Sequence, residues 1–148
     1  MTATGAAQLI ATLAAGLFAG AAIYINVAEH PARLDCGVSL AATVFAPSYR
    51  RAAVMQALLA VLGSFAGVVA WILGAGIAWL GGAVVLFFVV PFTLFVIMGT
   101  NKRLLDPSLD RTSVETQRLL IRWGRLHAVR SVAGAVAFVI FAVLMRSS

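Results

Sequence analysis

Four long runs of apolar residues, separated by short polar segments, constrain this chain more than any other feature of its sequence. Their approximate bounds are residues 5–28, 51–73, 77–99 and 126–145. A helix that crosses the hydrocarbon core of a bilayer needs about 20 mainly apolar residues. Each run meets that length, so the sequence predicts four membrane-spanning helices.

The composition argues against a water-soluble fold. Hydrophobic residues make up 62% of the chain and charged residues 11%, whereas soluble domains carry about 25% charged residues. We therefore predict one domain over residues 1–148, an all-α integral membrane four-helix bundle with antiparallel up-down order. The N-terminal segment lacks the positive charge of a signal peptide, so the first span is expected to be retained.

Two helical features are expected outside the spans. In the first loop, apolar residues recur at helical spacing, at Leu34, Val38, Ala41 and Phe45. This pattern predicts a short interfacial helix that Pro47 ends. Thr112 and Glu115 fit a capping box, which predicts a long fourth helix from about residue 113 that extends into the cytoplasm before its span.

The basic residues are distributed very unevenly. All eleven lysines and arginines except Arg146 lie in or beside the first and third loops, which share one side of a four-span protein. The positive-inside rule then predicts a bacterial inner-membrane topology, with both loops cytoplasmic and both termini outside. Topology thus explains the net charge of +6, and the lipid bilayer rather than nucleic acid is the expected partner.

Small residues and absent motifs narrow the possibilities further. The pairs Gly16/Gly20 and Gly63/Gly67 form GxxxG patterns, which favour close helix packing within the bundle or between copies in a homo-oligomer. Cys36 is the only cysteine, which excludes an intramolecular disulfide. The sequence contains no GxSxG, HExxH or Walker A motif, so common hydrolase mechanisms are not indicated.

Polar residues gather at the loop end of every predicted span. On helix one, a helical continuation would place four of them on one face: Asn26, Glu29, His30 and Arg33. Pro31 is expected to end or kink the helix at Glu29–His30, because proline disfavours α geometry in the residue before it. The simpler interpretation of such residues is a solvated helix end.

The other three helices bring polar residues to a similar depth. On helix four, Trp123, His127 and Arg130 are spaced to share an inward face, with Glu29 the expected partner of Arg130. Pro91 is expected to kink helix three, where Thr93 can bond back to the backbone and Asn101 to face inward. The head of span two supplies Tyr49, Arg50 and the inward amide Gln56. Convergence of four helices favours a pocket at the cytoplasmic side.

The sequence resembles a known family. The blocks YINVAEHPAR, PSYRRAAVMQALL, PFTLFVIMGTNKRLLDP and RWGRLHAVR, in this order, resemble the anthrone oxygenase-like family of small membrane proteins, whose bacterial members are mostly catalogued as a domain of unknown function. The resemblance covers about residues 10–145. The resemblance implies that the family pattern emphasises nine positions of this chain, which are Glu29, Pro31, Arg33, Tyr49, Arg50, Asn101, Trp123, His127 and Arg130.

The first functional hypothesis is a membrane oxygenase or related redox enzyme, without a cofactor, acting on a hydrophobic anthrone- or quinone-like molecule. His127 is the natural base, Arg130 or Arg33 can stabilise an enolate oxygen, and Asn101 can donate a hydrogen bond. The aromatic side chains Trp123 and Tyr49 can stack on substrate rings. The predicted catalytic set is His127, Arg130, Glu29 and Asn101; the predicted substrate-binding set is Asn26, His30, Arg33, Tyr49, Arg50, Gln56 and Trp123.

Two alternatives remain open from the sequence. His30, His127 and Glu29 are a plausible ligand set for a non-haem metal, and the two histidines alone could hold a b-type haem. A non-enzymatic bundle that binds a lipid or small molecule, or that serves as a subunit of a membrane complex, would also suit basic residues around an apolar cavity.

Overall fold

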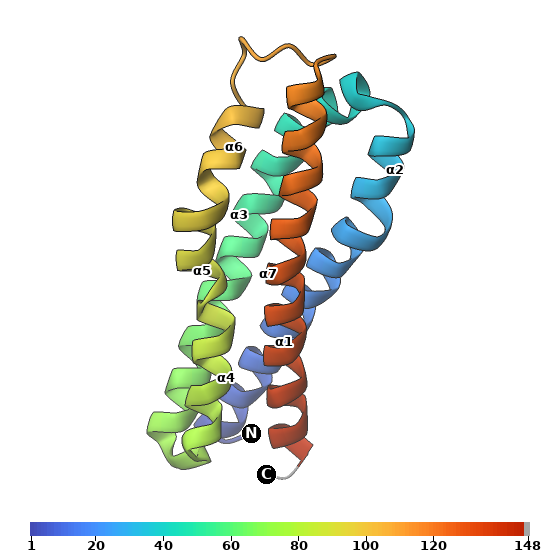
Figure 1. Cartoon of the computed structure of the whole chain (residues 1–148). Helices are drawn as coiled ribbons and strands as arrows, with labels where there is room; N and C mark the ends of the chain where they lie inside the picture. The colour runs from blue at the N-terminus through green and yellow to red at the C-terminus, as the bar shows by residue number, and fades with distance from the viewer. Residues whose placement is uncertain (147–148) are drawn as a thin grey trace.

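The computed structural model, which describes residues 1–146, is a bundle of four long helices with no strand in that range (Figure 1). Short π-helical turns divide the first and third of these, and another ends the second. In chain order the elements are α1 (Ala3–Tyr24), η1 (Ile25–Glu29), α2 (His30–Asp35), α3 (Val38–Ala70), η2 (Trp71–Ala75), α4 (Ile77–Phe87), α5 (Val89–Phe92), η3 (Thr93–Ile97), α6 (Met98–Leu104) and α7 (Val114–Arg146).

The helices run alternately up and down, as predicted. Figure 1 shows both termini and the η2–α4 connection at one end, which we call the terminal end. The α2–α3 and α6–α7 connections lie at the opposite, loop end. The four helical segments 3–35, 38–75, 77–104 and 114–146 are long and apolar enough to cross a membrane. The protein is therefore an integral membrane four-helix bundle.

The first long helix continues through Pro31, so the expectation that it ends at Glu29–His30 is wrong. The turn η1 directly precedes the proline, and the His30 N–H donates to the Ile25 carbonyl five residues back. Proline itself offers no N–H. The π turn accommodates one extra residue per turn, so the chain keeps helical dihedrals into α2.

The predicted interfacial helix is the first part of α3, and Pro47 does not end it. α3 is continuous over 33 residues with Pro47 inside. Buried residues before the proline, such as Phe45, and after it, such as Gln56, lie on one packed face. Pro47 itself is exposed, so packing of that face outweighs the one backbone hydrogen bond that the proline removes. Gly37, with φ of 97°, forms the turn from α2.

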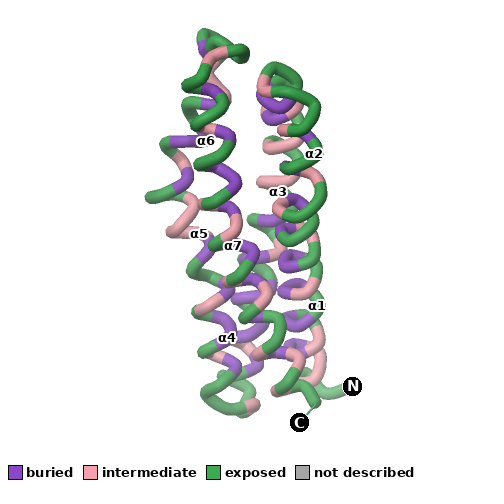
Figure 2. Tube along the Cα trace, turned by 45° about the vertical axis from the view of Figure 1, so that its right-hand side comes forward, coloured by how far each residue is buried: buried purple, intermediate pink, exposed green. Residues whose placement is uncertain are grey.

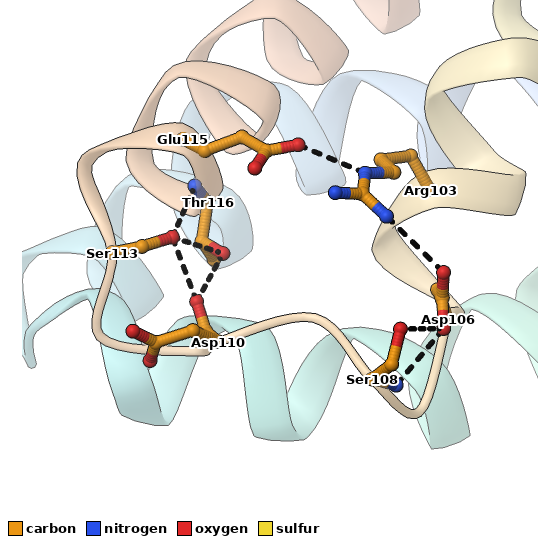
Figure 3. A network of polar contacts seen from close by, with 7 residues as sticks. All are labelled: Arg103, Asp106, Ser108, Asp110, Ser113, Glu115 and Thr116. Atoms are coloured by element: carbon orange, nitrogen blue, oxygen red, sulfur yellow. Dashed lines mark hydrogen bonds and ion pairs between the residues drawn. The ribbon is translucent and has the colours of Figure 1, made fainter.

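The start of α7 is capped by Ser113 rather than by the predicted Thr112–Glu115 box (Figure 3). The Ser113 hydroxyl accepts from the Thr116 N–H at 3.2 Å and donates to the Asp110 carbonyl at 2.8 Å. Glu115 instead accepts from Arg103 at 2.8 Å, which joins α7 to α6. The cap therefore lies one residue later than the sequence pattern indicated.

Two apolar cores occupy the two ends of the bundle, and Figure 2 shows buried positions recurring along the helices. The terminal-end core is built around Phe18, Leu86 and Phe141 with many alanines. The loop-end core contains Phe45 and Trp123 among its members. Along α3 and α7, Gln56 and Arg130 fall between the members of these two cores.

The glycine pairs pack within the bundle at three of their four positions. A Cβ atom at Gly16, Gly63 or Gly67 would lie 2.7–2.9 Å from a side chain of a neighbouring helix. At Gly20 the same atom would meet nothing within 4 Å. Close helix approach inside one copy therefore accounts for most of the GxxxG signal, and a homo-oligomer stays a prediction.

Candidate functional site

A small cavity, which we call the polar chamber, lies between α3 and α7 where the two cores meet. Its volume is about 20 Å³, which is room for about one water-sized group. Ile25, Phe45 and Trp123 contribute apolar wall. The polar lining consists of Arg33, Ser48, Tyr49, Gln56, His127 and Arg130. Five of these six were predicted as site residues from the sequence.

The geometry around His127 fixes which of its ring nitrogens carries a hydrogen. The amide nitrogen of Asn26 donates to the Gly124 carbonyl at 2.9 Å, so the amide oxygen faces α7. That oxygen lies 2.7 Å from His127 Nδ1 and accepts from the Ser131 hydroxyl at 2.6 Å. Since an amide oxygen only accepts, Nδ1 bears the hydrogen. A neutral His127 then has its lone pair on Nε2, which has no protein partner among the described residues.

Arg130 is a buried cation without a carboxylate partner in residues 1–146. Its side chain is 8% exposed. Nη2 donates to Gln56 Oε1 at 2.8 Å, and the guanidinium carbon lies 5.7 Å from the Phe18 ring centroid. Arg130 Nε and Gln56 Nε2 are both buried without a hydrogen-bond partner. A neutral amide and an aromatic face only partly compensate a buried charge, so the pair can still donate to an anion or a ligand oxygen.

Glu29 does not pair with Arg130 as predicted. It forms an ion pair with Arg33 one turn further along. Ser48 joins this pair, accepting from Arg33 at 2.8 Å and donating to Glu29 at 3.2 Å. The continuous helix through Pro31 explains the difference, because positions i and i+4 share a helix face. Glu29 thus neutralises Arg33 and joins α2 to α3.

Asn101 supports the chamber from outside rather than lining it. Its amide nitrogen donates to the Tyr49 hydroxyl at 3.1 Å, and its amide oxygen accepts from Trp123 Nε1 at 2.9 Å. Each polar atom has a hydrogen-bond partner, so Asn101 is placed to orient Tyr49 and Trp123, and its predicted contact with a substrate stays a prediction. Because the Tyr49 oxygen accepts from Asn101, its own O–H is the chamber donor on this side.

Trp123 forms the centre of an aromatic cluster that holds both histidines. Its ring stacks on His127 with centroids 4.8 Å apart and contacts His30 at 5.1 Å. Phe45 meets it edge-on at 5.2 Å and stacks on Tyr49 at 5.6 Å. Trp123 therefore fixes the His127 ring plane, and its predicted stacking on substrate rings stays a prediction.

His30 points inward, toward α7, despite the following proline. Its Nε2 lies 3.0 Å from the Leu120 carbonyl and donates to it, because a carbonyl only accepts. A Cβ on Gly124 would lie 2.8 Å from the His30 ring, so only glycine leaves room for the imidazole there. The His30 ring contacts Trp123 and does not line the polar chamber.

Two further predictions on the site can be compared with this geometry. Arg50 is exposed and lines neither the chamber nor the groove described below. His30, His127 and Glu29 each bond a different partner, and no group of three His, Cys, Asp or Glu in residues 1–146 is placed to hold a metal ion. Metal or haem binding therefore stays a prediction from residue types alone.

The sequence matches a model of a known family. A model of the family described as anthrone oxygenase matches residues 45–140. The chain belongs to this family. The match starts later than the resemblance predicted at residues 10–145, and it spans most of α3 and α7 with everything between them.

A curated anthrone oxygenase relative gives the same indication over a shorter stretch. The anthrone oxygenase tpcL of Aspergillus fumigatus is 39% identical over 62 residues, which is 40% of this chain and 38% of the relative. The chain thus matches well under half the length of that protein. No solved structure matches.

The matched region divides the site in two. Tyr49, Gln56, Asn101, Trp123, His127 and Arg130 lie inside the anthrone oxygenase match. Asn26, Glu29, His30 and Arg33 precede it, on the first long helix. Arg130, which has no carboxylate partner in residues 1–146, and the unpartnered His127 nitrogen therefore lie within the part of the chain that the family model matches.

Sequence reasoning missed two contributors, Ser48 and Gly124, and gave a third, Ser131, no role beyond the inward face of helix four. Ser48 bridges Glu29 and Arg33, Ser131 donates to Asn26, and Gly124 admits His30. Ser131 follows His127 by four residues, so helical spacing carried a signal for it. Nothing in the pattern distinguished Ser48 or Gly124 from ordinary small residues of a membrane helix.

A second cavity adjoins the polar chamber in this anthrone oxygenase family member. It has a volume of about 190 Å³ and lies between α3 and the α5–η3 segment. It shares Tyr49, Ala53, Gln56 and Arg130 with the chamber. We call it the apolar groove, because the rest of its lining is aliphatic apart from Thr93. The Thr93 hydroxyl donates to the Val89 carbonyl at 2.6 Å, which confirms the prediction that this residue bonds back to the backbone.

Proposed function

We propose that the protein is a membrane oxygenase that uses its own side chains, without a cofactor, to oxidise a hydrophobic anthrone-like molecule. One observation carries this proposal more than any other. A buried arginine without a carboxylate partner and a histidine with a directed lone pair line the same cavity. Membership of the anthrone oxygenase family supports the same reaction class.

The proposed base is Nε2 of His127. An anthrone methylene is acidified by the adjacent rings and carbonyl, so a neutral imidazole at the correct position is a suitable base. Asn26 supports this role by holding the hydrogen on Nδ1, and Trp123 by fixing the ring plane. Asn26 is thus a positioning residue in this proposal rather than a substrate ligand.

The proposed enolate site is Arg130 with the Tyr49 hydroxyl. Proton removal puts negative charge on the substrate oxygen, and preoriented donors in a water-poor site stabilise such charge strongly. Arg130 is already desolvated in the folded protein, so substrate binding does not add the desolvation free energy of this charge. Gln56 orients the guanidinium through its 2.8 Å hydrogen bond.

The rest of the reaction needs only dioxygen. The enolate gives its electrons to O₂ and a carbon–oxygen bond forms at the former methylene carbon. The resulting peroxide anion takes up one proton, and the hydroperoxide so formed loses water, which leaves a second ring carbonyl. One anthrone and one O₂ thus give one quinone and one H₂O. His127 is placed to return the proton that it removed.

The basic loop end is proposed to face the cytoplasm. Lys102 and Arg103 lie in the last turn of α6 and Arg111 in the α6–α7 connection, while Arg50 and Arg51 lie in the half of α3 nearer to that end. The positive-inside rule relates such clusters to the cytoplasmic side. The polar chamber would then lie nearer to the cytoplasmic leaflet, as the sequence predicted.

The test is oxygen uptake by purified protein supplied with anthrone in detergent micelles, with protein-free micelles as the background. His127→Gln and Arg130→Met should each lower the rate above background by roughly 100-fold or more, in the range of general acid–base and electrostatic effects. Arg125→Met, on the exposed face of α7, is the matched control and should keep the full rate. Equal rates in all four proteins would reject the proposal.

Metal analysis distinguishes this proposal from the alternative that a bound metal or haem does the chemistry. If a non-haem metal or haem does the chemistry, purified active protein will contain it in proportion to the chain, and a chelator or haem-free growth will abolish uptake. If the proposed chemistry holds, uptake continues at the same rate in metal-depleted protein.

A further inference from the structure

The apolar groove between α3 and the α5–η3 segment has a shape and lining that the polar chamber lacks. The chamber admits about one water-sized group, whereas the groove is roughly ten times larger. The two share Gln56 and Arg130, so the groove has one polar end and an aliphatic body. A ligand that fits both would be mostly apolar, with one oxygen at the inner end.

The sequence explains why a groove forms at this place. On α3, Ala53, Ala57 and Ala60 follow one another at helical spacing and leave the wall shallow. On the opposite side, the helix is interrupted at Phe88, three residues before Pro91, and η3 follows α5 as a wide turn. Such breaks in membrane helices occur where the chain lines a cavity.

The mouth of the groove faces the apolar surface of the bundle. Leu94 lines it and is 54% exposed, and Ala57 lines it and is exposed as well. In an integral membrane protein this surface contacts lipid. Arg130, at the inner end, is the only charged residue of the lining.

A larger surface cavity elsewhere has no such polar end. It measures about 350 Å³ and lies between α3 and α4. Its only polar residue, Ser64, donates its hydroxyl to the Ala60 carbonyl at 2.6 Å. Nothing there would hold an oxygen-bearing ligand in one orientation, so this cavity carries no comparable assignment.

We propose that the apolar groove is the binding site for the rings of a flat phenol- or enol-type ligand, which reaches Arg130 sideways from the bilayer. The ligand's oxygen lies against Arg130 and Tyr49 while its rings lie along Ala53, Ala57 and Val90. This assignment rests on the proposed function for its substrate class. It adds where the rings bind and how the molecule arrives.

The first experiment measures binding without turnover. The probe is 1,8-dihydroxyanthraquinone, and the signal is quenching of tryptophan fluorescence in lipid nanodiscs. Ala57→Leu fills the groove from an exposed position and should weaken binding about tenfold or more. Ala78→Leu makes the same change at an exposed position of α4 outside every cavity described and should leave the affinity unchanged. Equal affinities in the three proteins, or no saturable binding to the unaltered protein, would overturn the proposal.

The second experiment tests the route. If the probe arrives from the bilayer, adding lipid at constant total probe and protein dilutes it in the membrane and lowers occupancy. The membrane-excluded analogue anthraquinone-2-sulfonate, added to the water, should bind at least tenfold more weakly than the parent probe. Comparable binding of the two probes, with occupancy independent of lipid, would overturn lateral access.

The binding assay also separates this inference from the oxygenase proposal. Probe binding that Ala57→Leu weakens, in a protein without anthrone-dependent oxygen uptake, supports the groove and rejects the oxygenase. Oxygen uptake that Ala57→Leu leaves unchanged, together with unchanged probe binding, rejects the groove and supports the oxygenase.

Discussion

Arg130 donates through Nη2 to Gln56 Oε1 at 2.8 Å, and this neutral amide is its hydrogen-bond partner within residues 1–146. The nearby acid, Glu29, is bound to Arg33 instead. The chain thus keeps a buried positive charge between α3 and α7 without cancelling it. A buried positive charge without a carboxylate partner favours the binding of a negatively charged ligand. This is the basis of the first prediction.

Replacing Gln56 by glutamate should remove that property. A carboxylate at this position would pair with Arg130 and satisfy it, so anionic or enolate ligands would no longer be attracted. We expect Gln56→Glu to lower anthrone-dependent oxygen uptake at least tenfold while the melting temperature in detergent stays the same or rises. Gln56→Leu, which leaves Arg130 with no acceptor, should instead cost about 1–3 kcal/mol of unfolding free energy. A fully active Gln56→Glu protein would contradict the assignment.

Asn26 should affect turnover more than substrate binding. Its amide oxygen holds the hydrogen on His127 Nδ1, so Asn26→Ala frees the imidazole to exchange between tautomers. We expect kcat to fall roughly tenfold or more with KM little changed, since only the orientation of the base is lost. Nitrogen NMR of labelled histidine reports the tautomer directly. A rise in KM alone would place Asn26 against the substrate instead.

Gly124 should be intolerant of even one methyl group. Its Cβ would lie 2.8 Å from the His30 ring, held between Leu120 and Trp123. We expect Gly124→Ala to cost about 1–3 kcal/mol of stability from overpacking. Gly20→Ala meets nothing within 4 Å and is the matched control. Adding His30→Ala to Gly124→Ala should recover part of the loss, and no recovery would contradict the contact.

Acid should loosen the start of α7. Hydrogen bonds from the Thr112 N–H and hydroxyl lower the pKa of Asp110 below its usual range. A lowered folded-state pKa stabilises the fold above the unfolded value of about 3.9 and loses that contribution as the pH falls below it. Amide exchange near Ser113 should therefore speed up below about pH 4 in the native chain. Asp110→Asn should show no such step.

Cys36 offers a direct test of topology. It is the only cysteine of the sequence, it is exposed, and it lies at the α2–α3 connection of the loop end. A membrane-impermeant maleimide should label it in inverted inner-membrane vesicles and leave it unlabelled in intact spheroplasts. The reverse pattern would place the basic loops outside and contradict the proposed orientation.

The spans were predictable from the sequence because their apolar character leaves a membrane helix as the only way to satisfy the backbone. The inward directions of Gln56, His127 and Arg130 followed from helical periodicity, and their burial agrees. Their roles in binding or chemistry stay predictions.

Pairings were less predictable than directions. Arg130 lies beside Gln56 rather than Glu29, and Asn101 is occupied by Tyr49 and Trp123. Such choices depend on how helices rotate and slide against one another, which periodicity along one helix does not encode. The predictions that the helices end at Pro31 and Pro47 were wrong for a related reason. The local preference of these prolines to end a helix was weaker than the packing on both sides of them.

The π turn at Ile25–Glu29 determines where the residues after it point. An α-helix turns by about 100° per residue, so deleting one residue from this turn would rotate the following segment by about that angle relative to α1. His30 would leave the Leu120 carbonyl, and Arg33 would leave Ser48. Helix length, hydrophobicity and side-chain identity would barely change. Among relatives, a one-residue gap at this position would therefore mark proteins with a different chemistry behind the same bundle.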